Sequence, residues 1–181
     1  MRYIQGMPVN GIVLRTVGAE DAAQMAALMR RVYAQTPFMN STEDEFRVTD
    51  AEEAAFLKGM EDSERDCMIG AWLDGALVGN VSVCAVDGRR RLRHRATLGI
   101  AVVREAWGRG VGSLLLDAAL QTAASAGFRQ MELEVAADNA RAIALYERFG
   151  FETYGRRPEA LRREDGAFVD ELLMFRRLGR G

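Results

Sequence analysis

The sequence predicts a single α/β domain built on a mixed, mostly antiparallel sheet of about seven strands, with helices on both faces. The chain has 181 residues, the size of one domain, and no internal repeat or low-complexity tract divides residues 1–181. Three consecutive segments with two-residue periodicity, 67–73, 76–86 and 96–103, indicate an antiparallel meander. The later apolar segments alternate with helical ones, which is typical of an α/β unit.

The first third of the chain predicts one strand and two helices. Val9–Val17 is a short apolar strand, and residues 18–21 open an Ala- and Met-rich helix that continues to about Tyr33. A second helix is expected after Thr49, because its hydroxyl and the Glu52 carboxylate fit a capping box.

The rest of the chain predicts the sheet and its crossover helices. Asp74-Gly75 between the first two meander segments is a strong hairpin signal. After a Gly-rich loop we expect, in order, a helix to about Ala126, a strand Phe128–Val135, a helix Asn139–Phe149, and strands Phe151–Arg156 and Phe168–Arg176 joined by a charged loop.

Composition excludes several classes of protein. Apolar residues make up 49% of the chain, enough for one buried core, and 24 basic against 26 acidic residues give a net charge of −2. No global field therefore attracts nucleic acid or a membrane. Met1–Pro8 contains no signal-peptide core, and no apolar run approaches the roughly 18 residues of a membrane span. We expect a cytoplasmic location.

Few residues are available for metal or nucleophilic chemistry. Cys67 and Cys84 lack metal-ligand spacing and lie in apolar, strand-like segments, so we interpret both as reduced core thiols. The only histidine, His94, lies in an Arg-rich turn, and Lys58 is the only lysine. We expect no metal site and no lysine-based covalent catalysis.

A glycine-rich loop between a strand and a helix predicts an anion site. Residues 102–113 contain Gly108, Gly110 and Gly112, which let successive backbone N–H groups turn toward one point at a helix N-terminus. A Walker A loop is excluded because no Lys is present. The even glycine spacing and the preceding meander also disfavour a dinucleotide fold, although Glu132 lies where a ribose-binding acid would be expected.

Two stretches resemble the GNAT superfamily of N-acetyltransferases. LGIAVVREAWGRGVGS, from Leu98 to Ser113, resembles its acetyl-CoA-binding motif, with Trp107 where the family has Arg or Gln. LEVAADNARAIALYERFGF, from Leu133 to Phe151, is most similar to the ribosomal-protein-alanine branch. The resemblance implies acetyl-CoA as co-substrate, held by backbone at a distorted strand end and by the glycine loop: Val102, Val103, Gly108, Arg109, Gly110, Val111, Gly112 and Ser113.

The resemblance also implies roles on the last helix. Tyr146 follows Asn139 by seven residues, so both side chains project from one helix face. A phenol, with a pKa of about 10, can donate to a departing thiolate. By resemblance Tyr146 is the general acid and Asn139 a CoA-binding or helix-capping residue. A tyrosine that only packs in the core remains the alternative.

Two carboxylates compete for the role of base. Glu132 and Glu134 alternate with Met131, Leu133 and Val135, so both leave the face that the apolar residues bury. In the similar alanine-acetylating branch the Glu of Leu-Glu-Val acts as base, directly or through water, and Glu134 matches it. The alternatives are that Glu132 or water acts as the base, or that both carboxylates only lie on a solvated strand face.

Two charged regions suggest partners. Residues 41–66 carry a net charge of −7, which would attract a cationic amine if they lie beside the acceptor cleft. The turn Arg89–Arg95 could contact an anion or could only be solvated.

The sequence thus predicts an acetyl-CoA-dependent N-acetyltransferase, acting on a primary amine of a small molecule or peptide by direct attack on the thioester. A non-catalytic CoA-binding regulatory domain of the same fold is the alternative. Neither nucleic acid nor a membrane is expected as partner, and a homodimer is allowed.

Overall fold

The computed structural model describes residues 8–179. The expectation that the N-terminus lacks a signal peptide falls on Met1–Pro8, and all of these residues except Pro8 lie outside that range. No helix of the described part is long and apolar enough to cross a membrane.

The strands of the described part are β1 (Ile12–Thr16), β2 (Cys67–Leu73), β3 (Ala76–Ala85), β4 (Arg95–Val102), β5 (Gln130–Ala136), β6 (Glu152–Arg162) and β7 (Phe168–Arg177). Its α-helices are α1 (Ala22–Gln35), α2 (Asp50–Asp62), α3 (Val111–Ser125) and α4 (Ala140–Arg148).

The strands of residues 8–179 form one seven-stranded sheet in the order β1-β2-β3-β4-β5-β7-β6. Only the central pair β4–β5 is parallel, because α3 connects these two strands. The other pairs are antiparallel. The predicted mixed, mostly antiparallel sheet is therefore confirmed.

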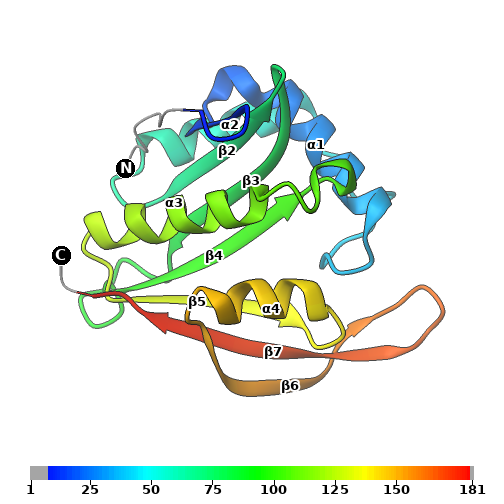
Figure 1. Ribbon diagram of the computed structural model, residues 1–181, viewed down its shortest axis with the longest axis vertical. Helices are drawn as coiled ribbons and strands as arrows, with labels where there is room; N and C mark the ends of the chain where they lie inside the picture. Colours follow the sequence, from blue (N-terminus) through cyan, green and yellow to red (C-terminus); the bar gives the residue numbers. More distant parts are fainter. Residues whose placement is uncertain (1–7, 180–181) are drawn as a thin grey trace.

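Helices cover both faces of the sheet, as two neighbouring residues of β3 demonstrate. The Asn80 amide approaches the sulfur of Met25 on α1 at 3.2 Å. A Cβ on Gly79 would instead come within 3.2 Å of Leu115 on α3. Since successive residues of a strand point to opposite faces, α1 and α3 lie on opposite sides. Figure 1 shows α3 and α4 crossing the near face, with α1 and α2 behind the sheet.

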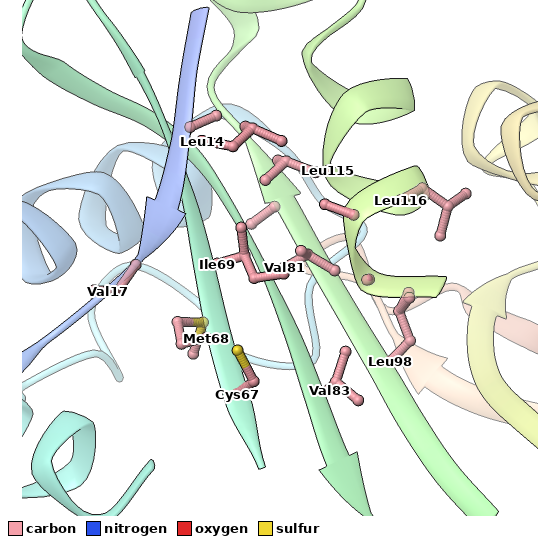
Figure 2. Close-up of a cluster of buried hydrophobic side chains, with 14 of the residues drawn as sticks. Leu14, Val17, Cys67, Met68, Ile69, Val81, Val83, Leu98, Leu115 and Leu116 are labelled. Atoms are coloured by element: carbon pink, nitrogen blue, oxygen red, sulfur yellow. The ribbon is translucent and has the colours of Figure 1, made fainter. Parts of the chain in front are cut away.

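One part of the core lies between α3 and the sheet, and another lies between the sheet and α1 and α2. Figure 2 shows Leu115 and Leu116 on α3 above branched side chains of the sheet, among them Ile69 and Val81. Both of these strand residues are fully buried and directly opposite each other in β2 and β3. Such interdigitated aliphatic packing, at about 1.5–3 kcal/mol per buried side chain, supplies most of the stability.

Two local sequence signals are confirmed in detail. Asp74 and Gly75 both have positive φ, the conformation that a two-residue hairpin turn requires. The Thr49 hydroxyl accepts from the Glu52 amide, and the Glu52 carboxylate accepts from the Thr49 amide at 2.9 Å. Cys67 pairs with Val83 rather than Cys84, so the two thiols point to opposite faces and are not bridged.

Two predicted boundaries are wrong. The charged segment after Arg156 is not a loop: β6 continues to Arg162 and pairs with β7 across two register shifts, which absorb the extra residues. Arg95 does not belong to the Arg-rich turn but begins β4.

Candidate active site

The two parallel strands at the centre of the sheet separate and open a cleft. β4 and β5 pair only where Arg95–Thr97 face Gln130–Glu132, near the start of each strand. Beyond that point lies a cleft of about 1370 Å³, lined by β4, β5, the glycine loop, α4 and the segment after α1. Figure 1 shows the gap between β4 and β5 widening toward their C-terminal ends.

Backbone groups of β4 face into this cleft. The Val103 amide donates to the Val78 carbonyl, and the Arg95 carbonyl accepts from Val86, so odd-numbered residues bond to β3. Backbone groups of alternate residues point to opposite sides, so those of Ile100 and Val102 point toward the gap. The indole of Trp107 donates to the Val102 carbonyl at 2.8 Å, which leaves the Val102 amide as a donor toward the cleft.

These contacts correct two expectations. Val103 is 1% exposed, and both of its backbone groups are used within the fold, since its carbonyl accepts from Ala106. It is therefore not placed to bind a cofactor. The strand end is also not distorted: the β3–β4 ladder runs without a register shift to Gly79–Val102, and the inward-facing amides result from the separation of β4 and β5.

The glycine loop leads into the N-terminus of α3, where the sequence predicts an anion cradle. Gly108 and Gly110 have φ of +75° and +84°, a conformation that only glycine adopts without strain. The Leu114 amide bonds to the Gly110 carbonyl, so the preceding amides at Val111, Gly112 and Ser113 have no acceptor within the helix. These three residues line the cleft, and the helix dipole adds partial positive charge there. The Arg109 side chain is exposed outside the cleft lining.

Trp107 connects this loop to α4. Besides its hydrogen bond to Val102, its ring lies 4.4 Å from the Arg141 guanidinium, a cation–π contact. Arg141 lines the cleft next to the cradle and adds a positive charge there. Sequence reasoning missed Arg141, and its place two residues after Asn139 was the only signal.

Helix α4 brings Asn139 and Tyr146 to the cleft. The Asn139 side-chain oxygen accepts from the Ala142 amide at 3.2 Å and caps the helix. Tyr146 is 6% exposed, lines the cleft, and packs against Phe151 with ring centroids 5.8 Å apart. Burial raises the pKa of the Tyr146 phenol well above its usual value, so the hydroxyl stays protonated at neutral pH.

The environments of the two carboxylates on β5 differ. Glu134 is half exposed at the cleft, with its oxygens 2.7 and 2.8 Å from the two terminal nitrogens of Arg157. The hydrogen bond from Arg157 lowers the pKa of the Glu134 carboxyl, outweighing the effect of burial. Glu132 is buried, and its carboxylate binds Arg95 and Gln130. Glu132 is therefore mainly a structural ion-pair partner.

The far end of the cleft is mostly apolar. Phe38, Met39 and Asn40 line it, but residues 41–66 do not. The expectation that the acidic segment borders the cleft is not supported, because none of its residues lines the cleft and α2 lies behind the sheet. Arg163, from the β6–β7 turn, binds Asp138 at 2.8 Å and lies over the Phe38 ring at 5.4 Å.

The chain belongs to the Acetyltransferase (GNAT) family, whose profile matches residues 28–151. A crystal structure of a GNAT-family acetyltransferase from Streptococcus pneumoniae superposes with a TM-score of 0.88, at 32% identity, covering 93% of this chain and 99% of that one. A phosphinothricin acetyltransferase of Sinorhizobium meliloti, solved in complex with AcCoA, gives a TM-score of 0.83 at 25% identity, covering 94% and 90%.

Among curated proteins, the L-amino acid N-acetyltransferase AaaT of Escherichia coli K12 is 36% identical over 108 residues, 59% of this chain. The match covers 65% of AaaT, slightly less than two thirds of its length. A ribosomal-protein-alanine N-acetyltransferase from Brucella melitensis has a TM-score of 0.81 at 23% identity over 91% and 99% of the two chains, which shows the shared fold alone.

Proposed function

We propose that this protein is an acetyl-CoA-dependent N-acetyltransferase whose acceptor is a small primary amine. The observation that carries the proposal is the opening between β4 and β5. The backbone of Val102, the N-terminus of α3 and the buried phenol of Tyr146 line this one cleft, which supports the proposal.

The cleft offers hydrogen-bond donors to two polar parts of acetyl-CoA, its pyrophosphate and its pantetheine. The amides at the start of α3 and the Arg141 guanidinium suit the pyrophosphate, with Arg109 contributing backbone to the same loop. The Val102 and Ile100 backbone suits the extended pantetheine, which can pair with β4 as a further strand would. Asn139, at the start of α4, completes the cofactor side.

The chemistry follows from what borders the thioester. The neutral amine attacks the carbonyl carbon, a C–N bond forms, and the C–S bond breaks. Tyr146, kept protonated by its burial, donates to the leaving sulfur. Glu134, ionised at neutral pH, accepts the proton that the amine loses, directly or through water. A backbone amide on β4 stabilises the developing oxyanion.

Three features support a small acceptor. Arg163 of the β6–β7 turn binds Asp138 and contacts the Phe38 ring, so this turn lies beside the end of the cleft that Phe38 lines. Phe38 and Met39 provide apolar contact area. AaaT, a relative of the matched region, is named for L-amino acids. The proposal includes a cytoplasmic location and allows a homodimer.

A binding and a turnover measurement test this function. Acetyl-CoA should raise the melting temperature, whereas NAD should not, and thiol should be released when amines are added. Stabilisation by acetyl-CoA without thiol release from any amine would instead favour the non-catalytic CoA-binding domain. No stabilisation by millimolar acetyl-CoA would refute both.

A further inference from the structure

One guanidinium holds two carboxylates of the cleft together. Arg157 on β6 binds Glu134 on β5 through both terminal nitrogens, and one of these nitrogens also lies 2.6 Å from Glu171 on β7. Glu134 and Glu171 line the cleft, whereas Arg157 does not belong to its lining. Arg157 thus holds the two acids in place although it does not line the cleft itself.

The sheet register makes this arrangement specific. Glu171 lies opposite both Arg157 and Ala136 in the adjoining ladders, and Glu134 is two residues before Ala136 on the same face of β5. The Arg157 side chain therefore extends across β7 to reach β5. A register shift in β6 begins directly after Arg157 and ends the regular pairing there.

Other charged groups also line this cleft, among them Arg141, Glu147 and Arg148 of α4. Glu132, on the same strand, is neutralised by Arg95 of β4, and Asp138 by Arg163 of the β6–β7 turn. Tyr154 of β6 lines the same cleft, and the segment after α1 contributes only uncharged side chains. The group formed by Arg157, Glu134 and Glu171 carries a net charge of −1 of its own. Without Arg157 the two neighbouring carboxylates would repel each other, and one would take up a proton more readily.

We propose that Arg157 is a positioning residue of the acceptor subsite, which joins Glu134 and Glu171 into one monoanionic site for an ammonium group and orients Glu134 to receive its proton. The inference rests on the proposed N-acetyltransferase function. It identifies the acceptor as an amine that arrives as a cation. It also explains how the half-exposed Glu134 carboxylate keeps one orientation, because its two hydrogen bonds to Arg157 restrict both of its oxygens.

The test compares Arg157→Gln with two other variants. Arg157→Lys keeps the positive charge but loses the two-pronged geometry. Arg156→Gln is the matched control: Arg156 is the neighbouring β6 arginine, pairs with Asp170 of β7 at 2.5 Å, and lies with it outside the cleft lining. Both Arg156 and Arg157 are substantially exposed, so the variants should fold, and thermal melts check this.

The readout is kcat/KM against pH, expressed as the ratio of variant to wild type. The ratio cancels the ionisation of the acceptor amine, which is common to both enzymes. For Arg157→Gln the ratio should fall as the pH is lowered, because the acidic limb of the variant's profile moves to higher pH. Arg157→Lys should recover most of this loss, and Arg156→Gln should match wild type.

A second readout does not depend on turnover. Carboxyl ¹³C NMR of labelled glutamate should show a higher pKa for Glu134 in Arg157→Gln than in wild type, and no change in Arg156→Gln. An unchanged Glu134 pKa, or superimposable pH profiles for Arg157→Gln and wild type, would overturn this inference while leaving the proposed function intact. Absence of thiol release by the wild type with every amine would overturn the proposed function, whatever the NMR titration shows.

Discussion

Substitution of Gly110 separates the effect of backbone strain from that of charge in the cradle. Gly110 is the N-cap of α3 at φ +84°, and a Cβ there would meet nothing within 4 Å. Gly110→Ala and Gly110→Asp should therefore both lose about 1–2 kcal/mol through the left-handed conformation alone. For a chain of this size, that lowers the melting temperature by about 2–8 °C.

The two variants should differ in ligand binding. At about 100 times its dissociation constant, acetyl-CoA adds roughly 2.7 kcal/mol, or about 5–11 °C, to the wild type. Gly110→Ala should keep most of this increase. Gly110→Asp should lose it, because its carboxylate occupies the positive end of α3 and repels a pyrophosphate.

Thermal melts of both variants, with and without acetyl-CoA, provide the assay. Without ligand, Gly110→Asp should be no less stable than Gly110→Ala, since an acid at a helix N-terminus contributes about 0.3–1 kcal/mol. If Gly110→Asp kept the full increase with acetyl-CoA, the cradle would not be the pyrophosphate site.

Substitutions at four further positions test the site. Tyr146→Phe should lower kcat more than it weakens acetyl-CoA binding, measured by steady-state kinetics and calorimetry; a loss of binding alone would make Tyr146 a packing residue. Glu134→Gln should lower the neutral-pH rate by about 10² to 10⁴ and recover at high pH, whereas Glu132→Gln should mainly lower the melting temperature; equal rate losses would remove Glu134 as base. Asn139→Ala should cost about 1 kcal/mol of stability and Asn139→Ser much less; equal melting temperatures would contradict the capping role.

Local signals made most of the fold predictable. The Asp74-Gly75 turn, the Thr49–Glu52 capping box and the uninterrupted apolar run of β2 each depend on residues close in sequence. The length of β6 was not predictable in this way. Its charged residues resemble a loop, and they form a strand because β7 offers partners across two register shifts.

The candidate site was predictable only in part, because its chemistry depends on contacts between distant segments. Motif spacing located Gly110 and Tyr146, but nothing local indicates that Arg157, 23 residues after Glu134, binds that carboxylate. The role of Glu132 was not predictable either. Alternation along the strand put it on the same face as Glu134, but its ion pair with Arg95 depends on the pairing of β4 with β5. The backbone amides near the end of β4 are likewise free to bind a ligand only because β5 diverges from β4 there.

The most direct test of the central claim follows acetyl-CoA and a panel of primary amines in one reaction with the wild-type protein. Released thiol is measured with a thiol-reactive dye, and the acetylated amine by mass spectrometry. The account predicts equal amounts of both products with at least one small cationic amine, and loss of both in Gly110→Asp. Bound acetyl-CoA that yields neither product with any amine would contradict it.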